Sequence, residues 1–396
     1  MEFGRDVVIV GGCGRVGLPL GLAFADRGLT VALYDVDEAA VATVNAGRMP
    51  FDEPGGPPVL ARVAGRGLEA GSDPAVVSTS ECVVVVVGTP VDEHLNPDPL
   101  AVPGAVEELG AHLRDGQLIV LRSTLYPGVT RLVAQVVERL GLSVDVAFCP
   151  ERIAEGKAMT ELYELPQIVS GHTPQAADRA EKLFRNLTGQ VVHLETDEAE
   201  LAKLFTNTWR YLRFAIANQL FMIANDYGVD FERLRAALAY DYPRAADLPG
   251  AGLAAGPCLF KDTMQLAAFN NNNFVLGHAG MAVNEGLPLY LVARLEKRFD
   301  LSSATVGILG MAFKAESDDV RSSLSYKLKR ILRFKAAEVL CTDPHVTVDP
   351  GLVALEEVLE RADLLVVGTP HAAYRGLDPR QPVVDVWNVL GRGVRV

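Results

Sequence analysis

The sequence predicts an α/β protein in which two parallel-sheet domains flank a helical spine. Short β-branched runs alternate with helical patterns in the first half of the chain, a long middle stretch is helical, and alternation then returns. Continuous apolar runs separated by helices are typical of a parallel sheet with helices on both faces. We expect domains at residues 1–196, 197–298 and 299–396.

Strand-like apolar runs recur through the first domain with helical patterns between them. They lie at residues 7–10, 30–34, 82–87, 117–121 and 144–148. The first two enclose a glycine cluster and a helical pattern, and so predict a βαβ unit. The later runs extend the same parallel sheet.

The middle domain opens with 31 residues, 198–228, that contain no proline and no interior glycine. This stretch predicts one long helix ending at Gly228. Residues 231–240 and 279–299 also have helical patterns. The last domain returns to strand-like runs at 304–313, 336–346 and 362–371, which predict a second parallel sheet.

Composition excludes several classes of partner and site. The net charge of −13 disfavours nucleic acid and anionic membranes as partners. The five cysteines are widely spaced and include no CxxC pair, so we expect no disulfide framework, no metal site and a reducing cytoplasm. The charged N-terminus is unlike a signal peptide, and no apolar run is long enough to span a bilayer.

A dinucleotide-binding fingerprint occupies the first strand-to-helix junction. Gly12, Gly14 and Gly17 form G-x-G-x-x-G, and Asp35 ends the next strand-like run. The glycines permit close approach to a pyrophosphate at the N-terminus of a helix, which is the arrangement of a Rossmann-like domain. Asp35 can accept both ribose hydroxyls and repels a 2′-phosphate, which favours NAD over NADP. FAD-binding folds share the fingerprint, so the glycines alone do not exclude FAD.

One cysteine lies in a loop suited to chemistry. Cys258 is in "GPCLFKD", residues 256–262, within a glycine-rich loop between helical patterns. A thiolate can add to an aldehyde, and loss of hydride then leaves a thioester for hydrolysis. Lys261 and Asp262 can tune the thiolate or a water. The alternative is a packed small side chain, which is how we interpret the other four cysteines.

Seven segments carry a resemblance to one family over nearly the whole chain. In order they are "VGGCGRVGLPLG", "VGTPVD", "RSTLYPGVT", "CPERIAEGKA", "ELAKLFTNTWRYLRFAIANQ", "GPCLFKD" and "GMAFKAESDDVRSS". These segments resemble motifs of the UDP-glucose/GDP-mannose dehydrogenase family, the nucleotide-sugar 6-dehydrogenases. The resemblance implies two Rossmann-like domains that bind NAD and the nucleotide, and a homodimer formed through the central helices.

The resemblance also implies roles for individual residues. Cys258 would be the nucleophile, Lys203 and Asn207 would stabilise the oxyanion, and Glu151, Asp262 and Thr124 would manage protons and the hydrolytic water. The implied NAD-binding residues are Gly12, Gly14, Val16, Gly17, Asp35, Thr89, Pro90, Thr124, Glu155 and Arg321. The implied substrate-binding residues are Glu151, Arg152, Lys203, Asn207, Arg244, Gly250, Leu253, Phe313 and Lys314, with Arg244 reaching the neighbouring subunit's site.

The reaction implied is the four-electron oxidation of a nucleoside-diphosphate hexose to its uronic acid. Two alternatives remain open: a two-electron 3-hydroxyacid or 6-phosphogluconate type of dehydrogenase, and a non-catalytic nucleotide-sugar-binding protein. Departures from the family pattern at Gln219, Ala254-Ala255 and Pro257 leave the sugar and the base undetermined. Lys261-Asp262 after the cysteine argues mildly against the N-acetylhexosamine subgroup.

Overall fold

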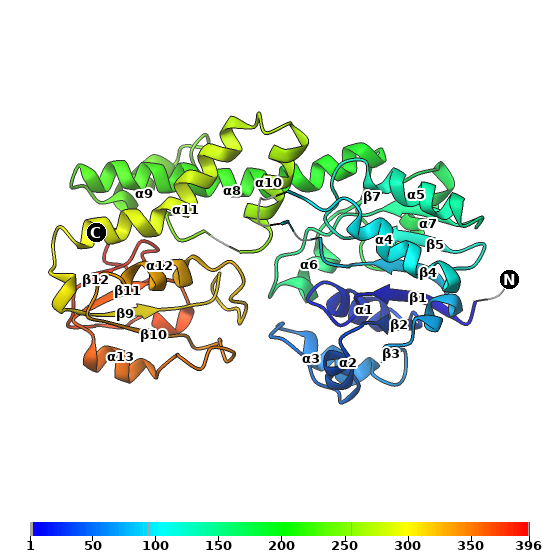
Figure 1. The fold of residues 1–396 in the computed structure, drawn as a ribbon, viewed down its shortest axis with the longest axis horizontal. Coiled ribbons are helices and arrows are strands. Elements are labelled where there is room, and N and C mark those ends of the chain that lie inside the picture. The colour runs from blue at the N-terminus through cyan, green and yellow to red at the C-terminus, as the bar shows by residue number, and fades with distance from the viewer. Residues whose placement is uncertain (1–2, 90, 93–95, 255, 395) are drawn as a thin grey trace. The chain divides into compact units, whose positions relative to one another are not determined.

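The computed structural model describes residues 3–89, 91–92, 96–254, 256–394 and 396 (Figure 1). The chain forms two compact units, Met1–Thr206 and Asn207–Val396. Each unit contains one β-sheet, which confirms the predicted α/β class with two parallel-sheet domains. The division falls within the long helix, and the three-domain division stays a prediction.

The sheet of the first unit has eight strands in the order β3-β2-β1-β4-β5-β6-β7-β8. All neighbouring pairs are parallel except β6 and β7, which are antiparallel, a reversal that the sequence analysis did not anticipate. The strands are β1 (Arg5–Val10), β2 (Val31–Tyr34), β3 (Leu68–Gly71), β4 (Ser80–Val85), β5 (Leu118–Leu121), β6 (Asp145–Phe148), β7 (Gln167–Gly171) and β8 (Val191–His193).

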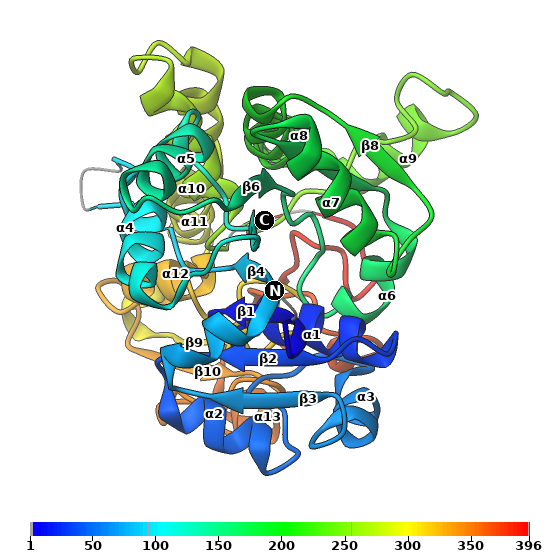
Figure 2. The ribbon, with the colours of Figure 1, turned by 90° about the vertical axis from the view of Figure 1, so that its right-hand side faces the viewer.

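Helices cover both faces of this sheet because its central strands are apolar on both sides. Val7 and Ile9 of β1 pack into one core, and Val8 and Val10 pack into the other, as the two-residue period of a strand requires. Figure 2 shows α4 and α5 together on one face, with α1, α3, α6 and α7 on the other. The helices are α1 (Gly17–Asp26), α2 (Glu38–Asn45), α3 (Gly56–Val63), α4 (Ala101–Glu108), α5 (Val129–Arg139), α6 (Ala158–Glu164) and α7 (Pro174–Phe184).

Side-chain acceptors hold the starts of three helices in this unit, α2, α5 and α7. Asp37 accepts hydrogen bonds from the first backbone N–H groups of α2, and Thr173 accepts one at the start of α7. The start of α5 is capped from a distance, because the buried Glu200 carboxylate accepts the backbone N–H groups of Gly128 and Thr130 at 2.6 and 2.8 Å. Glu200 lies on the long helix, so that helix is tied to the loop that follows β5.

The predicted long helix is α8 (Thr196–Asp226), which ends two residues before Gly228. It is followed by α9 (Phe231–Ala239), α10 (Leu259–Phe269) and α11 (Val275–Leu295). The helix α10 begins directly after Cys258 and was not predicted. Among the described residues, no helix combines the length and the apolar character that crossing a membrane requires.

The second sheet is parallel and has the strand order β10-β9-β11-β12. Its faces are covered by α12 on one side and α13 on the other, with α8 and α11 packed beyond α12 in the same core. The elements are β9 (Thr305–Leu309), α12 (Leu324–Leu332), β10 (Glu338–Thr342), α13 (Leu355–Arg361), β11 (Leu364–Val367) and β12 (Val383–Val384).

Candidate active site

The predicted NAD-binding residues of the first unit lie where neighbouring strands end. The fingerprint follows β1, Asp35 follows β2, Thr89 comes after β4 and Thr124 comes after β5. These strands are adjacent in the order β2-β1-β4-β5, so their carboxyl ends share one edge of the sheet. In an open α/β sheet that edge is where ligands bind. Pro90 lies outside the described residues.

The fingerprint glycines are required by close packing at the start of α1. A Cβ on Gly17 would lie 2.4 Å from the Gly11 carbonyl oxygen, and one on Gly12 would lie 2.8 Å from the Leu33 Cα. Gly14 is exposed and Val16 is the residue before α1. The backbone is therefore open at the N-terminus of α1, where N–H groups are available to a phosphate. This geometry fits the pyrophosphate of a dinucleotide.

Two carboxylates hold the rim of the fingerprint. Asp35 Oδ2 accepts the backbone N–H of Cys13 at 2.9 Å, and its Oδ1 accepts that of Asp37 at 3.0 Å. Glu155 pairs with Arg15 of the fingerprint loop at 2.8 Å. Asp35 and Glu155 are therefore positioned against the loop that they are predicted to serve.

Glu151 lies after β6 in a buried ion pair that the sequence analysis missed. Its Oε2 is 2.5 Å from the nearest guanidinium nitrogen of Arg122, whose side chain is 0% exposed. Its Oε1 accepts the backbone N–H groups of Arg152 and Ile153 at 2.6 and 2.8 Å. Arg122 also stacks on the Phe184 ring. Both carboxylate oxygens are thus engaged, which favours a positioning role over proton transfer for Glu151.

Arg152, the residue after Glu151, contacts the segment before β7. Its guanidinium donates to the Pro166 carbonyl oxygen, and burial lowers the pKa of the side chain. Thr124 is half-buried beside this part of the sheet edge. Lys203 is half-buried on α8, one helical turn before Asn207.

In the second unit, a buried hydrogen bond joins α8 to α10 close to Cys258. Asn207 Nδ2 on α8 donates to Asp262 Oδ2 on α10 at 2.5 Å, and both side chains are buried. Within the described part of the chain, Asp262 Oδ1 has no hydrogen-bond partner, and it lies 3.7 Å from Lys261 Nζ. A buried carboxylate oxygen in this state calls for a water or a ligand group. The pair therefore suits the handling of a reacting water.

Cys258 differs from the other cysteines in its exposure. It is exposed and is the residue directly before α10, whereas Cys13, Cys82, Cys149 and Cys341 are buried. Burial raises the pKa of Cys13, Cys82 and Cys149 to about 12, so these thiols stay protonated. A thiol at the N-terminus of a helix is in the position that favours a thiolate. The arrangement favours Cys258 as the reactive thiol.

The loop before Cys258 is held from two sides. Asn218 of α8 bonds both to the Gly252 carbonyl oxygen, at 3.0 Å, and to its N–H, at 2.9 Å. The Trp387 ring lies where a Gly252 Cβ would be. Gly256 has φ +110°, and a Cβ there would lie 2.6 Å from the Phe313 ring. Phe313, a predicted substrate residue, is thus brought against the nucleophile loop.

Other predicted residues of this unit are placed less closely. Leu253 is buried, Gly250 is half-buried, and Lys314 lies over the Phe313 ring at 5.8 Å. Arg321 is paired with Asp319, and Arg244 is exposed with its Nε 2.7 Å from the Tyr242 hydroxyl. The roles assigned to these residues stay predictions.

Comparison with known proteins decides the family. Three models of the UDP-glucose/GDP-mannose dehydrogenase family match consecutive parts of the chain: the NAD binding domain at residues 6–188, the central domain at 197–285 and the UDP binding domain at 307–392. The chain belongs to the UDP-glucose/GDP-mannose dehydrogenase family. It is therefore an NAD-dependent nucleotide-sugar dehydrogenase, as the seven motifs predict, and the first unit contains the NAD-binding domain.

Named relatives are similar to this chain over nearly its whole length. The UDP-N-acetyl-D-mannosamine dehydrogenase of Pyrococcus horikoshii is 31% identical, covering 98% of this chain and 93% of that protein. The NDP-N-acetyl-D-galactosaminuronic acid dehydrogenase of Ralstonia nicotianae is 29% identical, covering 94% and 92%. A solved UDP-glucose dehydrogenase from Pyrobaculum islandicum superimposes with a TM-score of 0.91 at 28% identity, covering 99% and 96%.

Proposed function

We propose that this dehydrogenase oxidises C6 of a nucleoside-diphosphate hexose twice, from the alcohol to the uronic acid. The observation that carries the proposal is the exposed Cys258 at the start of α10, one turn before the buried Asp262 that bonds Asn207. A two-electron alcohol dehydrogenase has no use for a thiol so placed. An aldehyde-oxidising enzyme needs a thiolate nucleophile and a group to direct water.

Side chains of the candidate active site can carry the aldehyde through the second oxidation. The Cys258 sulfur adds to the C6 aldehyde, and the amide of Asn207 and the ammonium of Lys203 stabilise the oxygen that becomes negative. The fingerprint and Asp35 would hold NAD, and one NAD would accept the hydride lost in each oxidation. The second hydride leaves the Cys258 adduct and converts it into a thioester. Asp262 then directs a water to the thioester, which releases the acid and restores the thiol.

The substrate is proposed at the level of a nucleotide sugar. The UDP binding domain of the family spans the second sheet, and the named relatives act on UDP-linked or other nucleoside-diphosphate hexoses. Two of these three relatives are named for an N-acetylhexosamine or its uronic acid. This favours an N-acetylhexosamine substrate, whereas Lys261-Asp262 after the cysteine argues mildly against one. We expect the substrate to be a UDP-hexose. Incubating the enzyme and NAD with a panel of UDP-, TDP- and GDP-sugars, and measuring NADH by its absorbance, identifies the substrate.

We also propose that the enzyme is a homodimer through α8. Four large apolar side chains at spacings of seven, four and three residues face outward along the helix: Trp209, Ile216, Leu220 and Ile223, which are 57%, 52%, 39% and 57% exposed. This apolar stripe follows the spacing of one helix face. A continuous stripe of exposed apolar side chains marks an interaction surface.

The test of the reaction is the Cys258→Ser variant. A serine hydroxyl is nearly neutral and lacks thiolate nucleophilicity, so the variant should bind NAD and nucleotide sugar but fail to complete the second oxidation. Cys82→Ala removes a buried thiol and serves as the control. Steady-state NADH formation near the wild-type rate in Cys258→Ser would remove Cys258 from the reaction.

A further inference from the structure

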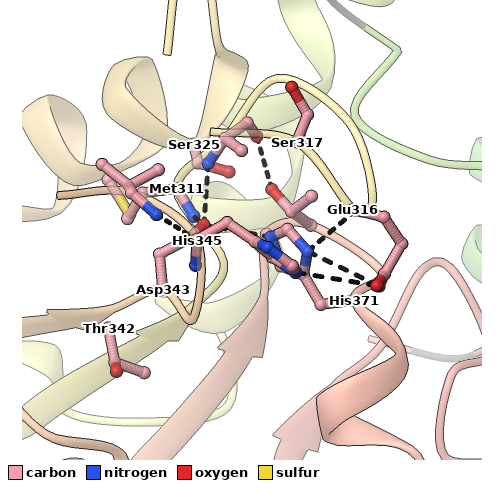
Figure 3. Close-up of polar contacts among 12 residues, drawn as sticks. Met311, Glu316, Ser317, Ser325, Thr342, Asp343, His345 and His371 are labelled. Carbon is pink, nitrogen blue, oxygen red and sulfur yellow. Dashed lines mark hydrogen bonds and ion pairs between the residues drawn. The ribbon is translucent and has the colours of Figure 1, made fainter. Parts of the chain in front are cut away.

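Three loops at the carboxyl edge of the second sheet bring together one carboxylate and two imidazoles (Figure 3). Glu316 follows β9, His345 follows β10 and His371 follows β11, and these strands are neighbours in the order β10-β9-β11. The sequence analysis predicts no metal site because the cysteines include no CxxC pair, and the spacing of these three residues matches no short metal-binding motif. Only the fold makes them adjacent.

The potential ligand atoms face one another. Glu316 Oε2 lies 3.6 Å from His345 Nε2, and Glu316 Oε1 lies 3.8 Å from His371 Nδ1. One ligand atom from each residue lies within 4.8 Å of the other two. Zn²⁺ bonds of about 2.0–2.1 Å place tetrahedral ligand atoms roughly 3.3 Å apart. The Glu316 side chain is 53% exposed, and its Oε1 accepts the backbone N–H of Ala372 at 2.6 Å, which leaves Oε2 to make the small approach that is needed.

A second carboxylate fixes the orientation of His371. The His371 side chain is fully buried, and its Nε2 lies 3.0 Å from Asp343 Oδ2. The Asp343 carboxylate also accepts backbone N–H groups, those of Met311, Ala312, His345 and Val346. Four backbone donors are directed at this carboxylate, so each of its contacts uses an Asp343 oxygen as the acceptor. Asp343 is therefore an acceptor, and His371 Nε2 carries the proton.

The remaining nitrogen of His371 is thus an acceptor directed at Glu316. The backbone N–H of Glu316 donates to His371 Nδ1 at 3.1 Å, which agrees with a lone pair on that atom. Histidines that bind metals characteristically donate their other ring N–H to a carboxylate. A metal ion at Nδ1 would replace one neutral hydrogen bond and leave the Asp343 contact intact.

We propose that Glu316, His345 and His371 form a binding site for a divalent transition metal ion, with Zn²⁺ as the expected occupant. Two imidazoles and one carboxylate suit Zn²⁺, Co²⁺ and Ni²⁺, whereas Mg²⁺ and Ca²⁺ prefer oxygen ligands throughout. Three protein ligands leave a fourth position for water. The ion would tie the loop after β9, which carries Phe313 and Lys314, to the loops after β10 and β11.

Cobalt binding to the full-length Cys258→Ser protein tests the site, because that background removes the exposed thiol as a competing ligand. We expect one Co²⁺ per chain, visible absorption bands of a four-coordinate nitrogen and oxygen site, and displacement by Zn²⁺. His345→Ala and Glu316→Ala change partly exposed residues and should each weaken binding by at least about tenfold. His193→Ala, which removes an exposed histidine paired with Glu181, is the matched control and should bind as the parent does.

Thermal unfolding of each variant without metal shows whether it is folded before binding is measured. Failure of the parent protein to bind Co²⁺ would overturn the proposal. Binding that survives both His345→Ala and Glu316→Ala unchanged would also overturn it, because the ion would then lie elsewhere. Neither outcome bears on the oxidation chemistry, which is tested by NADH formation and not by Co²⁺ binding.

Discussion

Asp35 is held at the end of β2 by two backbone N–H groups, so its carboxylate has a defined place beside the fingerprint. A ribose 2′-hydroxyl can donate to it, whereas a 2′-phosphate is repelled. We predict that NADP is disfavoured by about 2 kcal/mol or more, roughly thirtyfold in kcat/KM. Asp35→Asn should bring the kcat/KM values for NAD and NADP closer together. Glu38→Gln, which changes a nearby exposed carboxylate, should leave their ratio unchanged. Equal kcat/KM values for NAD and NADP in the wild-type enzyme would show that Asp35 does not face the ribose.

The buried ion pair between Arg122 and Glu151 gives a second prediction for single residues, on the stability of the fold. Replacing it with methionine leaves Glu151 buried and charged without its guanidinium, so Arg122→Met should lower the free energy of unfolding by about 3–5 kcal/mol. Arg131→Met breaks an exposed pair with Asp197 and should cost less than about 1 kcal/mol. Urea unfolding measures both. Similar small losses would mean that the Glu151 carboxylate is stabilised by its backbone donors alone.

Candidate residues could be picked out from local sequence only where a motif fixes a backbone feature. The glycines and Asp35 of the fingerprint, and the cysteine of a glycine-rich loop, have local signals in the sequence. Arg122 and Asn218 have none, because their partners come from distant strands and loops. An Arg before "STLYPG" and an Asn within an apolar helix do not by themselves identify those partners.

At the scale of elements, the nucleophile loop depends on one glycine. Gly256 combines φ +110° with close contact to the Phe313 ring. We predict that Gly256→Ala lowers the free energy of unfolding by about 1–3 kcal/mol, because both the backbone and the ring must move. Gly250→Ala, at a position with ordinary φ and no atom within 4 Å of an added Cβ, is the control for stability. Equal melting temperatures for the two variants would contradict this account of the loop.

The apolar stripe of α8 makes a second prediction at this scale. A charge at its centre, Ile216→Glu, should convert a dimer into a monomer, because burying an unpaired carboxylate is costly. Gln219→Glu adds the same charge to an exposed polar position of α8 and should leave the dimer intact. Sedimentation velocity distinguishes the two. A wild-type protein that is monomeric at all concentrations would rule out the stripe as a dimer surface.

At the scale of the whole molecule, the α/β class with two parallel sheets could be predicted because hydrophobic period and glycine junctions are local. Short strands such as β3 were not, since four residues carry little pattern. The antiparallel step between β6 and β7 also lay beyond the sequence, because pairing direction depends on how the chain returns after α6. The cluster around His371 needed the order β10-β9-β11, which no local pattern contains.

The central claim is that one chain carries out two oxidations on one sugar. The most direct measurement is the ratio of NADH formed to nucleotide sugar consumed, with the product identified by mass. Because the Cys258 thioester requires a second loss of hydride before hydrolysis, we predict two NADH for each sugar and an acid product. One NADH for each sugar, with a free aldehyde or ketone as product, would contradict the account and favour a two-electron dehydrogenase.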